Sequence, residues 1–169
     1  WKDIALDQDS RLVARIIRSG AARGDTLLVW GYRPAIFAYT GLRPGSRFLD
    51  SQPLTGVPAE RHFTVSEPVA PLVAMVNRAE LRRTTPTYIV ECLGSANPRL
   101  AIENFGDLRP WLAEYELAGR TPISLIFKRR ESPDAAGVLA HHRLPGFAGE
   151  RPLELGHVHD DAVDAVLAR

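Results

Sequence analysis

The sequence predicts an α/β domain with a layered, Rossmann-like sheet of about four mostly parallel strands flanked by helices, and an irregular C-terminal tail. Short, almost wholly apolar segments alternate along the chain with segments whose apolar residues recur at helical spacing, as in sheets that helices cover on both faces. The 169 residues suit one domain with a substantial core. An apolar content of 45% and a charged content of 24% are ordinary for a globular protein.

The first element is expected to be a helix over residues 9–19. One apolar stripe follows the helical repeat at Leu12, Val13, Ile16 and Ile17. Asp7, Asp9 or Ser10 can cap the start of this helix, and Gly20 can close it in the left-handed conformation.

A strand, a short helix and a second strand are expected next. The run "GDTLLVWG" at residues 24–31 predicts a strand that is buried on both faces. Pro34 suits the first turn of a helix that continues through Tyr39, because the N–H that proline lacks has no partner there. Gly41 can end that helix. The segment "SRFLD" at residues 46–50 predicts a second, shorter strand.

The middle of the chain begins with residues 52–67, which proline and glycine interrupt and which we expect to form a surface loop with little regular structure. Pro68 then opens a helix. The buried stripe of that helix is expected at Val69, Leu72, Val73, Val76 and Ala79. The run "TYIVEC" at residues 87–92 predicts a third strand.

The last part of the domain is expected to hold a helix over residues 105–118 and a fourth strand within residues 121–130. One side of the helix carries Leu108, Trp111, Leu112 and Tyr115. Residues 1–132 therefore make up the α/β domain. Residues 133–169 have weak periodicity and many breakers, which predicts an irregular tail on or after the same domain, with one short helix over residues 160–167.

Composition excludes several classes of function. The net charge is +1 and the basic residues are spread among acids, so no nucleic-acid partner is expected. Cys92 is the single cysteine, which rules out an internal disulfide and is expected to be a buried thiol. No run reaches the roughly 20 apolar residues that span a bilayer. Because the chain opens with Trp1 rather than Met, we expect a piece of a longer protein whose membrane or catalytic portion lies outside it.

One candidate binding site lies where the predicted strands end. Ligands of open α/β sheets bind beyond the carboxyl ends of the strands, where Gly31, Tyr32, Arg33, Gly94 and Ser95 are expected. An anionic ligand such as a sugar phosphate suits that edge. In the alternative, Arg33 pairs with a local carboxylate and Tyr32 packs on the rim. No glycine-rich nucleotide motif is present.

Catalytic and metal sites are not predicted. Asp25, Asp50, Glu91 and Glu103 are scattered carboxylates with no evident pairing. The weak metal candidates are His157, His159 and Asp160, since imidazole and carboxylate suit zinc or nickel. Their spacing matches no established site and, like His141 and His142, they fall in the irregular tail. A solvated tail is the preferred interpretation, so neither a metal nor another cofactor is predicted.

An ordered string of residues carries a resemblance to a known family. The segment "GDTLLVWGYRPAIFAYTGLRPGSRFL" resembles part of the soluble C-terminal region of bacterial multi-spanning glycosyltransferases of family 39, which are similar to protein O-mannosyltransferases and lipid A aminoarabinose transferases. The matching positions are Asp25, Val29, Trp30, Gly31, Pro34, Ile36, Phe37, Tyr39, Thr40, Gly41, Pro44, Ser46, Arg47 and Phe48. The resemblance covers residues 6–130 and is strongest over residues 25–48. Phe37 departs from it, since tyrosine is commoner there.

The resemblance implies a function and a place in the cell. Members of the family transfer a sugar from a polyprenyl-phosphate donor on the non-cytoplasmic membrane face. Their catalytic acid lies in a loop that this chain does not contain, so no catalytic residue is carried over. The chain would then be a non-catalytic accessory domain in the periplasm or outside the cell, which helps to position acceptor or donor. Its partner would be the membrane-embedded portion of the same polypeptide, and the parent protein would be the enzyme.

The arginines between the first two predicted strands can be interpreted in the same way. With Ser46, the guanidinium groups of Arg33, Arg43 and Arg47 would form a rim that faces anionic lipid or polyprenyl phosphate. A structural role is the alternative, and it is favoured for Arg47. Two other functions stay open: an independent soluble α/β module that binds a phosphorylated small molecule, and a protein-interaction domain that uses residues 52–67.

Overall fold

The computed structural model describes residues 2–131, and the expected tail and its helix lie outside this range. The fold is α/β, as predicted, with a mixed sheet of five strands in the order β2-β1-β3-β5-β4. The strands are β1 (Thr26–Trp30), β2 (Arg43–Pro44), β3 (Tyr88–Glu91), β4 (Tyr115–Arg120) and β5 (Leu125–Arg129). β2 and β3 run parallel to β1, β5 runs antiparallel to β3, and β4 runs antiparallel to β5.

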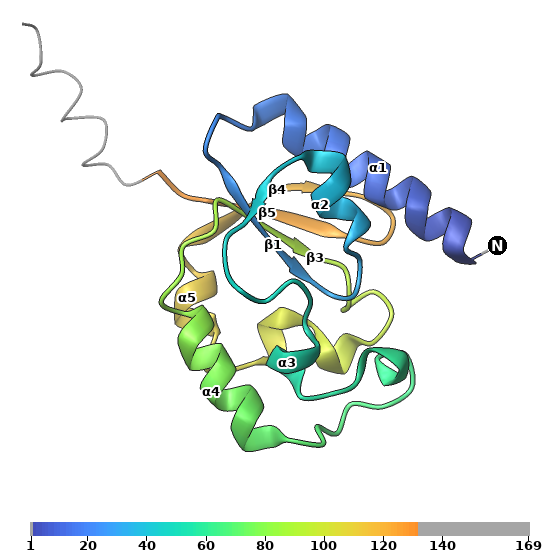
Figure 1. Cartoon of the computed structure of the whole chain (residues 1–169), viewed down its shortest axis with the longest axis vertical. Helices are drawn as coiled ribbons and strands as arrows, with labels where there is room; N and C mark the ends of the chain where they lie inside the picture. The colour runs from blue at the N-terminus through green and yellow to red at the C-terminus, as the bar shows by residue number, and fades with distance from the viewer. Residues whose placement is uncertain (1, 132–169) are drawn as a thin grey trace, which may run out of the picture. The chain divides into compact units, whose positions relative to one another are not determined.

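Helices cover both faces of the sheet, as Figure 1 shows. The α-helices are α1 (Lys2–Gly20), α2 (Ala35–Thr40), α3 (Gln52–Thr55), α4 (Pro71–Leu81) and α5 (Arg109–Leu112). Three short 3₁₀ helices complete the domain, at η1 (Ala59–Arg61), η2 (Pro98–Leu100) and η3 (Ile102–Asn104). The α1 and α2 helices lie on one side of the sheet, while α3, α4 and α5 lie on the other.

The strand β1 is buried on both faces, which confirms the prediction from its apolar run. Alternate side chains of a strand point to opposite faces. Leu27 and Val29 accordingly pack in the core beneath α1 and α2, whereas Leu28 and Trp30 pack in the core on the other side. The indole N–H of Trp30 donates to the carbonyl of Leu100 at 2.9 Å, so this large side chain is fully buried without an unpaired polar group.

The first helix is longer than expected, and its predicted caps are wrong. Asp9 and Ser10 lie in the middle of α1, where both are buried, and the hydroxyl of Ser10 donates to the carbonyl of Leu6 inside the helix. Gly20 is the last helical residue, but the turn that follows takes its left-handed conformation at Gly24, with φ of 100°. The carboxylates of Asp7 and Asp9 have partners outside α1, described below, which the sequence pattern did not show.

The helix α2 and its end are as predicted, but the second strand is not. Gly41 closes α2 with φ of 70°, and its N–H donates to the carbonyl of Phe37 at 2.9 Å. The predicted strand over residues 46–50 is wrong, because β2 comes earlier and has two residues. The hydroxyl of Ser46 bonds with both the N–H and the carbonyl of Phe48, which holds these residues in a tight turn.

Residues 52–67 are packed against the domain, so the expected surface loop is also wrong. They contain α3 and η1, and Leu54, Val57 and His62 are buried. The imidazole Nε2 of His62 lies 2.9 Å from the carbonyl oxygen of Val57. The side-chain amide of Asn97 donates to the carbonyl of His62 at 2.7 Å. Tertiary hydrogen bonds of this kind order a segment that has no periodicity of its own.

The predicted helix over residues 105–118 is a short helix followed by a strand. Leu108, Trp111 and Tyr115 are buried as expected, and the rings of Trp111 and Tyr115 pack 5.1 Å apart. Their spacing fits one helical stripe, but α5 ends at Leu112 and Tyr115 begins β4. Pairing with β5 makes residues 115–120 a strand rather than a continuation of the helix, because each strand meets the hydrogen-bonding needs of the other's backbone.

Candidate functional site

Arg33 is buried rather than displayed on a rim. Its side chain is 8% exposed, and its Nη1 donates to Asp9 Oδ2 at 2.7 Å and to the hydroxyl of Ser124 at 3.0 Å. Its Nη2 donates to the hydroxyl of Ser10 and to the carbonyl of Leu6, both at 2.5 Å. Arg33 therefore connects α1 to the turn after β1 and to the residue before β5. Arg33 thus pairs with a carboxylate, which was the alternative to ligand binding. That carboxylate lies 24 residues away in the sequence.

Gly31 and Tyr32 form the turn that leaves β1 at this edge of the sheet. Gly31 has φ of 147°, and a Cβ there would collide with the sulfur of Cys92. Cys92 is buried, as predicted, and burial raises the pKa of its thiol to about 12. The side chain of Tyr32 is exposed. Glycine at position 31 is thus explained by close packing of two neighbouring strands, without any ligand.

The remaining predicted residues do not gather around one site. Arg47 makes a bidentate pair with Glu80, with Nε to Oε1 at 2.5 Å and Nη2 to Oε2 at 2.7 Å. Arg43 lies exposed in β2 and has no ion pair within residues 2–131. Ser46 belongs to the turn described above. The candidate metal residues His157, His159 and Asp160 lie outside the described residues, in which no cluster suited to a metal ion is found.

A pocket opens at the sheet edge where β3 ends and β5 begins, and we call it the edge pocket. Its volume is about 360 Å³. Gly94, predicted for a site at this edge, lines it together with Glu91, Ser95, Glu103, Asn104, Thr121 and Ser124. Glu91 and Glu103, which the sequence left unpaired, share this pocket. The edge pocket therefore carries two carboxyl groups among side chains of mixed character.

Glu91 is the most unusual group in the edge pocket, since its side chain is only 5% exposed. Its Oε1 accepts the N–H of Leu93 at 2.9 Å and the N–H of Gly94 at 2.7 Å. A Cβ at position 94 would stand 2.8 Å from its Oε2, so a side chain there would push the carboxyl group away. Burial raises the pKa of Glu91 and the charge of Glu103 raises it further, against the two N–H groups, which lower it.

The edge pocket can hydrogen-bond the hydroxyl groups of a ligand, because carboxyl, hydroxyl and amide groups converge in it. The sequence offered one signal for it: an acidic residue ends an apolar strand and a glycine follows three positions later. Glu103 gave no such signal, since a chain excursion through η2 and η3 brings it back to the pocket.

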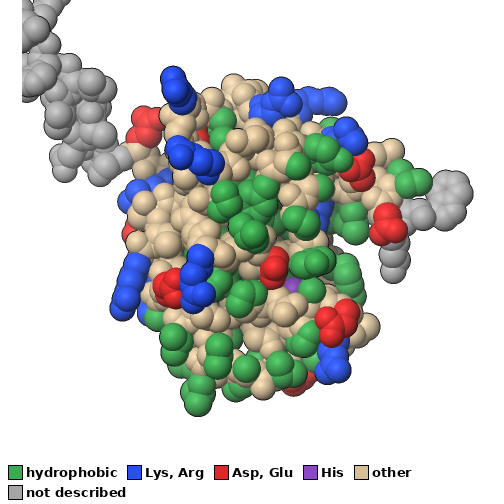
Figure 2. Space-filling view, viewed as in Figure 1, with side chains coloured by type: hydrophobic (Ala, Val, Ile, Leu, Met, Phe, Trp, Pro, Cys, Tyr) green, Lys and Arg blue, Asp and Glu red, His purple; other side chains and the backbone are tan. Residues whose placement is uncertain are grey.

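The helix α4 presents its apolar residues to solvent, which contradicts the predicted buried stripe. Leu72 is 75% exposed and Val76 is 67% exposed. With Val69, Val73 and Met75 they form an exposed apolar surface that we call the α4 stripe. The side of α4 that packs on the domain carries Ala74, Arg78 and Leu81 instead. Figure 2 shows hydrophobic side chains gathered along the lower edge of the visible surface, where Figure 1 places the start of α4.

Arg78 explains why α4 is turned this way. Its Nη1 donates to the carbonyl of Leu54 at 2.7 Å, and its Nε donates to both carboxylate oxygens of Asp107, at 2.8 and 3.0 Å. The guanidinium also lies 4.8 Å from the centre of the Phe105 ring. These bonds fix the side of α4 that carries Arg78 inward, so the α4 stripe is left without a partner among the described residues.

Comparisons with known proteins do not assign the chain to a family. No protein-family model matches the chain, and no curated protein or solved structure matches it either. In the part of the chain that the structure describes, none of the helices has the length and apolar character needed to cross a membrane.

Proposed function

We propose that this domain is the non-catalytic accessory domain of a membrane-embedded glycosyltransferase that uses a polyprenyl-phosphate-linked sugar donor. In this proposal the domain lies on the periplasmic or extracellular face of the membrane. The α4 stripe packs against the membrane-embedded portion of the same polypeptide. The exposure of that stripe is the observation that carries the proposal, and the family resemblance over residues 25–48 supports the choice of partner.

The composition of the α4 stripe supports an apolar partner. Residues 69–76 read "VAPLVAMV" and include no charged or hydrogen-bonding side chain. An exposed apolar patch of this kind is typical of an interaction surface. Covering one such side chain stabilises a complex by roughly 1.5–3 kcal/mol. The other end of α4 is polar, with Asn77, Arg78 and Glu80, so the partner contacts mainly the first two turns of the helix.

The edge pocket supports a role in positioning the acceptor or the donor. Sugar hydroxyl groups are both donors and acceptors, and Glu91, Ser95 and Asn104 offer partners for them. A domain that holds a sugar beside a membrane-embedded active site contributes orientation rather than chemistry.

The proposal is tested with the full-length protein in native membranes. Labelled polyprenyl-phosphate sugars extracted from the same membranes are supplied, and loss of the label from the donor is followed. The variant Leu72→Glu/Val76→Glu places two charges in the α4 stripe. We expect it to slow consumption of the donor at least about tenfold, since burying unpaired carboxylates disrupts the contact.

Leu117→Glu is the matched control, because Leu117 is an exposed apolar residue of β4, outside the α4 stripe. It should leave consumption of the donor unchanged. Both variants should keep the free energy of unfolding of the 169-residue chain within about 0.5 kcal/mol per substitution, since all three sites are exposed. A full-length protein that consumes no donor, or one that the stripe variant leaves fully active, would contradict the proposal.

A further inference from the structure

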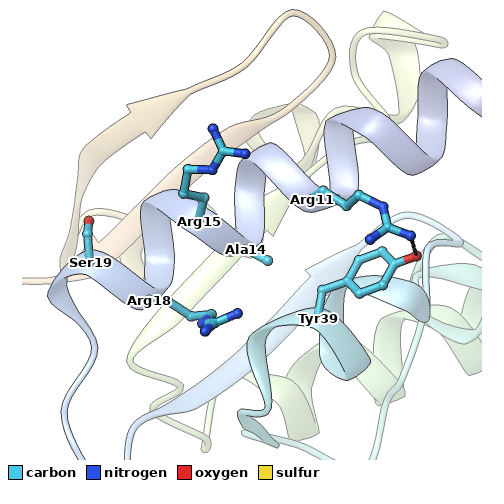
Figure 3. A pocket seen from close by; sticks show the side chains of 6 residues that line it. All are labelled: Arg11, Ala14, Arg15, Arg18, Ser19 and Tyr39. Carbon is cyan, nitrogen blue, oxygen red and sulfur yellow. Dashed lines mark hydrogen bonds between the residues drawn. The ribbon is translucent and has the colours of Figure 1, made fainter.

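Three arginines of α1 lie around one open pocket of about 570 Å³, which Tyr39 of α2 lines on the opposite side. We call it the arginine pocket, and it is lined by Arg11, Ala14, Arg15, Arg18, Ser19 and Tyr39. Arg11, Arg15 and Arg18 are separated by four and three residues, which places them on one side of a helix. In Figure 3, Ala14 lies between Arg11 and Arg18 on α1, and Tyr39 faces them from α2.

Arg11 is held in place by its neighbours. Its Nε donates to Asp7 Oδ2 at 2.8 Å, and its Nη2 donates to the hydroxyl of Tyr39 at 3.0 Å. The Tyr39 hydroxyl in turn donates to Asp7 Oδ1 at 2.5 Å. Bonds from Arg11 and then from Tyr39 lower the pKa of Asp7, which is therefore ionised at neutral pH. The wall of the pocket formed by Arg11 and Tyr39 is thus ordered before any ligand arrives.

Arg15 and Arg18 are exposed and have no ion pair within residues 2–131. Of the three guanidinium groups of the arginine pocket, Asp7 neutralises that of Arg11, which leaves two positive charges. Figure 3 shows Arg18 extending from α1 toward α2, over the pocket. Arg15 can turn toward the pocket without breaking an ion pair with any residue in the range 2–131. The arrangement attracts a compact anion with more than one negative charge.

We propose that the arginine pocket binds a phosphate monoester or diphosphate group. Guanidinium groups match phosphate oxygens with paired hydrogen bonds. The pocket holds many times the roughly 30 Å³ that one water molecule occupies in the liquid, so it accepts a diphosphate as well as a single phosphate. This site goes beyond the proposed function, because it uses residues of α1 and α2 rather than the α4 stripe or the edge pocket.

The test is isothermal titration calorimetry of the 169-residue chain with sodium pyrophosphate at low salt. We expect the wild type to bind and Arg15→Gln/Arg18→Gln to bind about tenfold or more weakly. The matched control is Arg83→Gln/Arg99→Gln, which removes the same charge at two exposed positions outside the arginine pocket and should bind as the wild type does. All four substituted side chains are exposed, so thermal unfolding should show every variant folded.

A second arm distinguishes a free phosphate from a lipid headgroup. Flotation with phosphatidylcholine vesicles, with and without phosphatidic acid, is measured for the same variants. Binding of pyrophosphate that depends on Arg15 and Arg18 supports a soluble phosphorylated ligand. Binding only to phosphatidic acid vesicles, with the same dependence, supports a lipid phosphate. Absence of binding in both arms, or equal loss in the two double variants, would overturn the proposal.

Discussion

The guanidinium of Arg33 and the carboxylate of Asp9 form a buried ion pair, with Nη1 2.7 Å from Oδ2 and side chains that are 8% and 3% exposed. The hydroxyl of Ser124 donates to the same Oδ2 at 2.7 Å, and the N–H of Ile123 donates to Oδ1 at 3.3 Å. Burial raises the pKa of Asp9, but Thr121, Arg33 and Ser124 outweigh it, so the pKa is lowered overall.

Removing one member of this pair should destabilise the domain strongly. Arg33→Met leaves the Asp9 carboxylate buried without its cation, and we expect the free energy of unfolding to fall by about 3–5 kcal/mol. Chemical denaturation measures it. The double variant Asp9→Leu/Arg33→Met should lose less free energy of unfolding than Arg33→Met alone, because no unpaired charge remains. Arg43→Met, at an exposed position, is the control. A loss in Arg33→Met no larger than in this control would show that the pair is unimportant for folding.

Gly31→Ala should destabilise the domain for two separable reasons. The left-handed φ of 147° strains any side chain, and the added Cβ meets the Cys92 sulfur. Together we expect a loss of about 2–4 kcal/mol. Gly41→Ala separates the two effects, since Gly41 also has positive φ but open space around it, and its loss should be smaller. Adding Cys92→Ala to Gly31→Ala should recover part of the stability. No recovery would mean that the collision with sulfur is not the cause.

Glu91 should make stability fall as pH rises through the weakly acidic range. Its folded-state pKa lies above the ordinary value of 4.5, so the folded state holds a proton that the unfolded state has already lost. Stability from this group is therefore complete below pH 4.5 and is lost as pH rises through the raised pKa. Glu91→Gln should abolish this loss. Thermal unfolding of both proteins between pH 4 and 8 measures the difference. Parallel pH profiles would contradict the raised pKa.

Local signals were sufficient to predict the central strands. The apolar runs that become β1 and β3 have few alternatives, because strands buried on both faces need such a composition. The end of α2 at Gly41 was equally predictable, since a helix end often requires a residue that tolerates positive φ. The stripe of Leu108, Trp111 and Tyr115 fitted a helix, but only pairing of β4 with β5 shows where the helix ends.

The candidate sites depended on contacts that a single sequence does not display. The pairing of Arg33 with Asp9 bridges 24 positions, so an arginine expected on a rim proved to be structural. The edge pocket arises because η3 returns Glu103 to the end of β3. For α4, periodicity grouped the apolar residues on one side of a helix, but the predicted burial of that side was wrong. It could not tell which side the domain would cover, because Arg78 and its partner Asp107 decide that side.

The most direct measurement of the central claim is photo-crosslinking from the α4 stripe in the full-length protein, in native membranes. A benzophenone amino acid replaces Leu72, and the same group at Leu117 serves as the matched site outside the stripe. Mass spectrometry then identifies the peptides joined to each position. We predict cross-links from position 72 to an apolar membrane-spanning segment of the same polypeptide, and none of that kind from position 117. Cross-links from position 72 to a second copy, to lipid or to a soluble protein would contradict the account.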